Sequence, residues 1–327
     1  MFKTNVKYSE IWKIAYPIIL GSIAQNLLNV TDTAFLGRVG AVELGAAAIG
    51  GIYYFVIIML GWGFGVGTQI IVARRNGEGT HSEIGRTVDH GFYFLIPMAI
   101  IMFSIMKYLS GGILATIVQS DDIRGATEAY IDYRSYGVFF AFINVLFRAF
   151  YVGIGRTQVI TYTTSIMALV NIVMDYLLIF GRFGFPEMGI AGAALASVIA
   201  EVTALGFLIV YTRFFFNTKP YALFHFRKFD PTLYLRIIRV SLPMMAQNFL
   251  SLAAWPAVHW LFFMTRSAGF AYNEVLVTLA VAPCGVAALR RCGLWIGTAT
   301  TSVLLMLAVN QVGAWWIGTV SGMSVEV

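Results

Sequence analysis

The sequence predicts an all-α integral membrane protein, folded as a bundle of membrane-spanning helices. Hydrophobic residues make up 59% of the 327 residues, charged residues only 12%, and the mean hydropathy is +0.78. Soluble domains carry about 25% charged residues. The apolar residues also gather in runs of roughly 20 or more, the length that crosses the hydrocarbon core of a bilayer. These observations exclude a soluble globular fold and make the lipid bilayer the main partner of the chain.

Six apolar runs follow one another along the first two thirds of the chain and are joined by short connections. Each is long enough to form a membrane-spanning helix, in some cases a tilted one. They cover residues 11–36, 44–73, 88–110, 128–153, 160–180 and 189–214. We therefore expect a complete bundle of six spans over residues 1–216.

The distribution of Lys and Arg predicts which end of each span faces the cytoplasm. With the N-terminus inside, fourteen basic residues fall in inner connections and five fall outside. The five on the outer side are Arg38, Lys107, Arg124, Arg134 and Arg182. Because basic connections stay in the cytoplasm, we expect a multi-pass protein of the cell inner (plasma) membrane with a cytoplasmic N-terminus. The first apolar run is too long for a cleavable signal peptide, so we expect it to act as an uncleaved anchor.

The first span carries a polar seam on an otherwise apolar helix. Spacings of three, four and three residues place four polar residues on one helix face: Ser22, Gln25, Asn29 and Asp32. Such a seam suits the wall of a wet cavity inside a membrane bundle. Ser22 and Asn29 could instead serve interhelical hydrogen bonds, as small polar residues in membrane helices often do. Asp32 differs from them, because an ionisable group inside a span is costly.

A second carboxylate lies at a similar depth in the fifth span. Asp32 lies about four residues from the outer end of its span and Asp175 about five from the outer end of its own, at about 1.5 Å per residue. Asn171 lies one turn before Asp175 on the same helix face. Two carboxylates that share a poorly hydrated site cannot both ionise cheaply, so they accept a proton or a sodium ion readily. The alternative is that both aspartates face outer headgroups or cap helix ends.

Glu201 lies about twelve residues into the sixth span, roughly 18 Å deep and near the bilayer midplane. Ser197 lies one turn before it. A carboxylate at that depth is a candidate functional group. It could contact a cationic substrate, relay a proton, or stay neutral in a hydrogen bond to a neighbouring helix.

The chain changes character after residue 216. Residues 217–239 are basic and contain Pro220 and Pro231, which predicts a cytoplasmic linker with an amphipathic piece on the membrane surface. Residues 240–327 then have room for about three further spans. Pro243 lies 226 residues after Pro17, and both prolines precede aliphatic residues and a Gln-Asn pair. This spacing suggests a repeat of the first bundle, of which only the opening fits in the chain.

Five short motifs share one family pattern. They are GIGRT at 153–157, NIVMDYLLIFG at 171–181, GIAGAALAS at 189–197, DTAFLGRVG at 32–40 and ELGA at 43–46. In their order along the chain and their predicted topology, these motifs resemble the multidrug and toxic compound extrusion (MATE) transporters, most closely the DinF-like branch. The resemblance covers residues 8 to about 255.

The resemblance implies a two-lobed fold of two six-helix bundles, of which this chain matches the first bundle and the opening of the second. It implies a secondary active antiporter that exports organic, often cationic and amphipathic, compounds in exchange for H⁺ or Na⁺. It also places cation coupling on three residues: Asp32, Asn171 and Asp175. Further lining of the cavity is expected from Gln25, Asn29, Ser197 and Glu201.

Two alternatives to efflux remain open. One is a flippase of the same superfamily that moves lipid-linked precursors. Such a protein needs Arg or Lys in its cavity to neutralise phosphates, whereas these spans offer acids and amides. The other is a truncated or frame-shifted product that does not transport. Association with another copy would be one way to complete the second lobe.

The residues give no support to other classes of function. No pairing of nucleophile and base indicates an enzyme, and no basic patch with interleaved aromatics indicates nucleic-acid binding. Cys284 and Cys292 lack the neighbours of a zinc site. We therefore expect no metal and no cofactor beyond the coupling ion.

Overall fold

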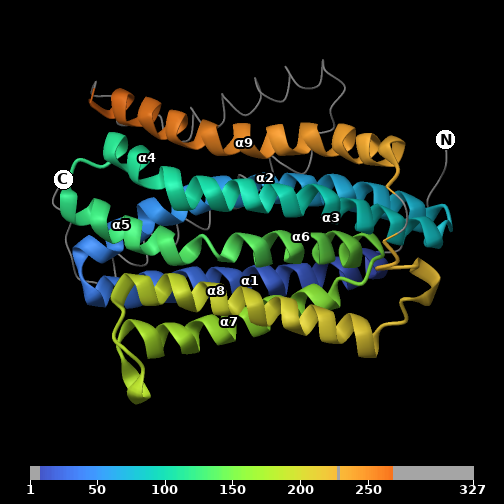
Figure 1. Ribbon diagram of the computed structural model, residues 1–327, viewed down its shortest axis with the longest axis horizontal. Helices are drawn as coiled ribbons and strands as arrows, with labels where there is room; N and C mark the ends of the chain where they lie inside the picture. The colour runs from blue at the N-terminus through green and yellow to red at the C-terminus, as the bar shows by residue number, and fades with distance from the viewer. Residues whose placement is uncertain (1–7, 227–228, 268–327) are drawn as a thin grey trace. The chain divides into compact units, whose positions relative to one another are not determined.

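A computed structural model describes residues 8–226 and 229–267, and in this part of the chain every regular element is helical (Figure 1). The longer elements are α1 (Tyr8–Val39), α2 (Ala41–Gly77), α3 (His81–Ser104), α4 (Ser110–Ile117), α5 (Asp121–Arg134), α6 (Gly137–Gly153), α7 (Gln158–Ile179), α8 (Gly189–Val210) and α9 (Pro231–Ser267). Short turns of 3₁₀- or π-helix are η1 (Ile105–Leu109), η2 (Arg182–Gly184), η3 (Tyr211–Phe215) and η4 (Lys219–Tyr221). The predicted all-α class is confirmed.

Five of the six predicted apolar runs each coincide with one continuous helical segment, and the fourth, residues 128–153, covers the end of α5 and all of α6. By length and hydropathy, four described segments are able to cross a membrane: Ala41–Gly77, His81–Ile117, Gln158–Ile179 and Gly189–Phe215. The pair α5 and α6, bent by 52°, makes a fifth if it is one span. Helix α1 is not in this set, and its polar seam lowers its hydropathy. The count of six spans stays a prediction.

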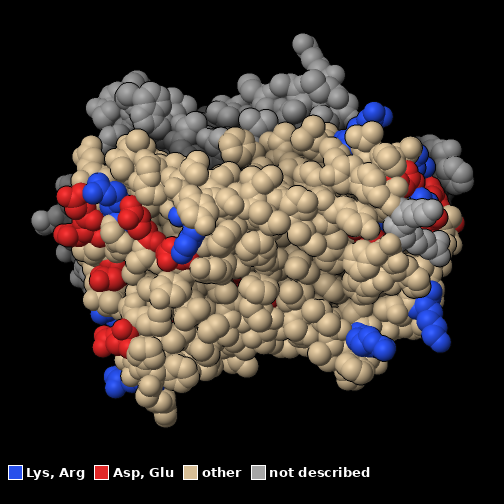
Figure 2. Space-filling view, in the orientation of Figure 1, with Lys and Arg blue, Asp and Glu red and all other residues tan. Residues whose placement is uncertain are grey.

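Charged side chains are sparse in the middle of the face of the bundle seen in Figure 2. Figure 2 shows Lys, Arg, Asp and Glu gathered toward the two ends of the visible face, with a broad band between them that is almost free of charge. Large apolar side chains such as Ile52, Ile100 and Leu169 are more than half exposed. An exposed apolar band bounded by charge is the surface that a bilayer requires. This pattern supports the integral membrane class.

Glycines on α2 let α6 and α9 approach it closely. A methyl group added at Gly61 or Gly65 would lie 2.6 Å from Phe142 or 2.2 Å from Val145, both on α6. On the other side of α2, a methyl group at Gly67 would lie 2.2 Å from the Ser241 hydroxyl on α9. The same hydroxyl donates to the carbonyl of residue 64 at 3.3 Å. Small residues at helix contacts are the usual device for tight packing in membranes.

Helices α1, α7 and α8 form the second group of close neighbours (Figure 1). The hydroxyl of Thr161 on α7 donates to the carbonyl of Pro17 on α1 at 2.5 Å. Gly192 on α8 packs against the backbone of Leu178 on α7, where a methyl group would lie 2.7 Å from the carbonyl oxygen. These contacts fix the faces of the three helices that carry the acidic residues of the predicted site.

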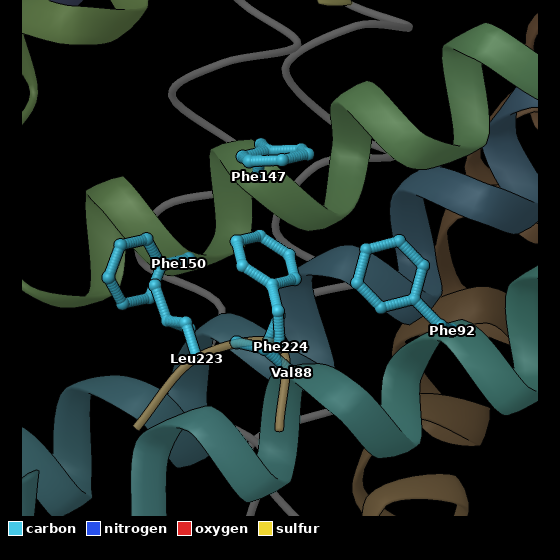
Figure 3. A pocket seen from close by; sticks show the side chains of 6 residues that line it. All are labelled: Val88, Phe92, Phe147, Phe150, Leu223 and Phe224. Carbon is cyan, nitrogen blue, oxygen red and sulfur yellow. The ribbon is translucent and has the colours of Figure 1, made fainter. Parts of the chain in front are cut away.

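Part of the connection between α8 and α9 is hydrogen-bonded to a buried side chain of α3. The buried carboxylate of Asp89 accepts the backbone N–H groups of Phe224 at 3.1 Å and Phe226 at 2.9 Å. Both residues have positive φ, 58° and 39°, a conformation that L-residues rarely adopt without support. Figure 3 shows Phe224 beside Phe147 of α6 and Phe92 of α3 in a small pocket with an entirely apolar lining. The segment is therefore held by two hydrogen bonds and by aromatic packing.

The predicted boundaries at residues 216 and 239 differ from the helix limits in the structure. Helix α9 begins at Pro231, inside the predicted linker, and continues past residue 240 to Ser267. Asp230 caps its start, since its Oδ1 accepts the N–H groups of Thr232 at 2.9 Å and Leu233 at 3.3 Å. The chain separates into two compact units, Met1–Ala253 and Ala254–Val327. The partial second lobe falls mostly outside the described residues, so the domain assignment stays a prediction.

Candidate functional site

Asp32 of α1 and Asp175 of α7, here called the carboxyl pair, meet across the amide of Asn171. With the amide turned so that its polar neighbours are satisfied, its nitrogen donates to Asp32 Oδ1 at 2.9 Å and to Asp175 Oδ2 at 3.1 Å. Its oxygen accepts the backbone N–H of Ser197 on α8 at 3.3 Å. The opposite orientation would direct the amide oxygen at two carboxyl groups, which are acceptors when ionised. One amide thus connects three helices.

The carboxyl pair is held away from water. Asp175 is fully buried and Asn171 is 1% exposed, while Asp32 is half-buried. The carboxyl groups of Asp32 and Asp175 share the amide nitrogen of Asn171 as their common hydrogen-bond donor. Two carboxylates that share one buried donor repel each other when both are ionised, so the site favours one proton on the pair. In the described part of the chain, Asp175 Oδ1 has no hydrogen-bond partner.

This geometry can hold a proton without any rearrangement. A sodium ion would take its ligands from carboxyl oxygens, and the amide oxygen of Asn171 would join them only after turning away from Ser197. Among the described residues, no group of three or more His, Cys, Asp or Glu side chains could hold a metal ion. The site is therefore built from two acids and one amide.

The other seam residues of α1 do not take part in this contact. Gln25 is half-buried, while Ser22 and Asn29 are exposed. The Ser22 hydroxyl donates to Ile18 of its own helix at 3.0 Å. Among the described residues, neither Gln25 nor Asn29 hydrogen-bonds to the carboxyl pair or to Asn171. Their predicted role in lining a cavity stays a prediction, as do the roles of Ser197 and Glu201.

Glu201 forms a second polar centre together with Arg134, and we call these two residues the buried ion pair. Arg134 Nη2 lies 2.7 Å from Glu201 Oε1, and the two side chains are 11% and 12% exposed. The hydroxyl of Tyr54 on α2 donates to both carboxylate oxygens, at 3.2 and 3.3 Å. The Arg134 guanidinium also lies over the Tyr54 ring, 3.8 Å from its centre.

From the sequence, Arg134 counts only among the basic residues of the outer side and has no predicted partner. It is the last residue of α5, and the 52° bend between α5 and α6 directs this end of α5 into the bundle. Gly137, just beyond the bend, leaves room for the contact, since a methyl group there would lie 2.6 Å from Glu201 Oε2 and 2.7 Å from Arg134 Nη1. The signal that could have found the pair is an arginine inside an apolar run, opposite a midplane glutamate.

Comparisons with known proteins agree with the motifs. Residues 17–177 match the family model MatE. The chain is 30% identical over 231 residues to a probable multidrug resistance protein NorM of Agrobacterium fabrum, covering 70% of this chain and 50% of that protein. The chain belongs to the MATE family. A second probable NorM, from Idiomarina loihiensis, is 28% identical over 264 residues, or 78% of this chain and 56% of that protein.

MATE structures show the same fold. An outward-facing multidrug resistance MATE transporter of the MOP superfamily superposes with a TM-score of 0.70 at 21% identity, over 86% of this chain and 60% of that one. An inward-facing structure with the same description gives 0.64 at 20% identity, over 73% and 55%. This chain thus spans about half the length of the MATE relatives that it matches. MATE proteins are transporters and not enzymes, while the DinF-like branch stays a prediction.

Proposed function

We propose that this chain supplies the N-terminal bundle of a secondary active multidrug efflux antiporter in the cell inner membrane. It would export organic, often cationic and amphipathic, compounds in exchange for H⁺ or Na⁺. The MatE match, the NorM relatives and the apolar band between charged ends support this proposal. We keep the predicted cytoplasmic N-terminus as part of it, because it rests on the distribution of Lys and Arg.

The observation that carries the proposal is the amide of Asn171 between Asp32 and Asp175. Asp32 belongs to α1 and Asp175 to α7, so the charge on the pair acts directly on the contact between two helices. When a cation is bound the two carboxyl groups attract it together, and when it leaves they repel each other. Cation binding would therefore draw α1 toward α7, and release would loosen that contact.

Coupling to export follows from this change in helix contact. Alternating access moves bundles around a shared site near the midplane, and α1 contacts both α7 and α2. A cation that shifts the position of α1 would change the inner wall of the bundle. The substrate would then meet a different cavity in the cation-bound state and in the cation-free state.

The test is ethidium efflux from energised cells that express the 327-residue chain. We expect efflux by the parent and its loss in Asp175→Asn, because the amide cannot carry a charge that a cation neutralises. Asp122→Asn, an exposed carboxylate at the start of α5, is the matched control and should keep parental efflux. Equal efflux by Asp175→Asn and the parent, at equal amounts in the membrane, would contradict the coupling role. Absence of efflux from a well-inserted parent would contradict transport by this chain as it stands.

A further inference from the structure

The buried ion pair lies next to the carboxyl pair. On α8, the backbone N–H of Ser197 donates to the amide oxygen of Asn171. Glu201 follows Ser197 one turn later, about 6 Å along the same helix. Tyr130 on α5 is partly buried and lies one turn before Arg134 on the same helix face. Gly50 on α2 makes room for its ring, since a methyl group there would lie 2.6 Å from Tyr130 Cδ1. Tyr130 also packs against the cluster that contains Leu36, one turn after Asp32, and Ile179, one turn after Asp175, so it lies between the two centres.

Charges one or two helix turns apart in a poorly hydrated interior interact strongly, so the charge of Arg134 acts on the carboxyl pair. Its guanidinium remains ionised in any protein environment. A fixed positive charge beside a cation site competes with the cation, because the two repel each other and attract the same carboxylates. In the structure Glu201 offsets the charge of Arg134, and its Oε1 lies 2.7 Å from Arg134 Nη2.

The balance of charge supports the same conclusion. The two centres together hold three acids and one base, so one proton shared by the carboxyl pair leaves a single negative charge. One monovalent cation completes the neutralisation. If Arg134 left Glu201 and turned toward the carboxyl pair, it would take the place of that cation. Arg134 Nη1 is buried without a hydrogen-bond partner among the described residues, so a further acceptor would be favourable for it.

We propose that Arg134 is an internal competitor of a sodium ion at the Asp32–Asp175 pair, and that Glu201 is the positioning residue that holds it off. This inference rests on the proposed cation site. Stability alone does not account for the arrangement, because a buried ion pair contributes little net stability compared with apolar residues of similar size. A competing internal charge also gives the bundle a means to expel its cation, since opening the ion pair would be sufficient.

The test is the binding of ²²Na⁺ to the purified full chain in detergent at alkaline pH, where protons compete least. In Glu201→Gln the charge of Arg134 is no longer offset, and we expect the sodium affinity to fall by about tenfold or more. In the double variant Glu201→Gln/Arg134→Gln both charges are removed, and the affinity should return to within about threefold of the parent. A monodisperse elution profile and the melting temperature of each variant control for folding.

The recovery in the double variant is the decisive measurement. A purely structural ion pair would leave the double variant as weak as the single one, and that result would overturn the proposal. An unchanged affinity in Glu201→Gln would overturn it as well. If Glu201→Gln does not fold, the double variant still decides, because the proposal requires it to bind sodium like the parent.

Asp175→Asn separates this inference from the function on which it rests. If the parent binds ²²Na⁺ and Asp175→Asn does not, the cation site stands and the two Glu201 variants decide the role of Arg134. If the parent binds no sodium, the competition with sodium is overturned, while a proton-driven efflux that depends on Asp175 would leave the proposed function in place.

Discussion

Asn171 and Asp175 lie one turn apart on α7, and the amide nitrogen of Asn171 donates to Asp175 Oδ2 at 3.1 Å while also reaching Asp32 on α1. The amide therefore separates and orients two acids that would otherwise face each other directly. This contact links the spacing of residues in one helix to the packing of two helices. It also makes Asn171 the residue whose removal should most directly disturb the carboxyl pair.

Asn171→Ala should lower the apparent melting temperature of the purified chain. Hydrogen bonds to charged groups contribute about 1.5–3 kcal/mol each, and the variant loses its bonds to Asp32 and Asp175. We expect the free energy of unfolding to fall by about 3 kcal/mol. Gln25→Ala is the matched control, because Gln25 is half-buried on α1 and makes no such contact, and its effect should stay within about 0.5 kcal/mol. Equal melting temperatures for Asn171→Ala and the parent would contradict the bridge.

Gly67→Ala should weaken the contact between α2 and the start of α9. The added methyl group would lie 2.5 Å from Ser241 Cα as well as 2.2 Å from its hydroxyl, so the two helices must separate. Overpacking of this kind costs about 1–3 kcal/mol. Gly51→Ala on the same helix meets nothing within 4 Å and should be neutral or slightly stabilising. Thermal unfolding in detergent measures both, and a stable Gly67→Ala would contradict the close approach.

The cap of α9 should depend on pH in the acidic range. The N–H groups of Leu233 and Thr232, with Arg86 nearby, lower the pKa of Asp230 from its usual 3.8. A group whose folded pKa is lowered stabilises the fold above its unfolded pKa, and the contribution is lost as the pH falls through the folded value. Hydrogen exchange at Thr232 and Leu233 should therefore accelerate below about pH 4, relative to its intrinsic rate.

Asp230→Asn is the control for that experiment. Asn also caps helices well but does not titrate, so protection at Thr232 and Leu233 should persist at acidic pH. Acid-induced loss of protection that is identical in Asp230→Asn and in the parent would show that another group controls the cap.

The predicted topology is checked with reporter fusions. With a cytoplasmic N-terminus, a reporter placed after Thr218 should be active in the cytoplasm. A reporter placed after Arg182, in the connection between α7 and α8, should be active outside. The physical reason is the retention of basic connections on the inner side. Exchanged locations for the two fusions would invert the orientation and with it the predicted outer location of the carboxyl pair.

Local composition and spacing were sufficient to predict the helical segments and the relative level of their polar residues. Span length and hydropathy depend only on local composition, and for this reason the predicted runs coincide with helices. The spacing of Asn171 and Asp175 fixes a common helix face, and counting residues from the ends of two spans brought Asp32 to the same level. The meeting of these three residues was therefore predictable before any helix was packed.

Which polar groups become partners depends on the packing of the helices and could not be predicted from spacing. Arg134 appeared in the sequence as one more basic residue for the topology, and its burial depends on the bend after α5 and on the space left by Gly137. The direction of the Asn171 amide depends on Ser197 of another helix. The start of α9 at Pro231 and the clamp of Asp89 on Phe224 and Phe226 depend likewise on contacts between distant segments. Periodicity assigns a residue to a face of its own helix, whereas the identity of the opposite side chain is fixed by how the helices pack together.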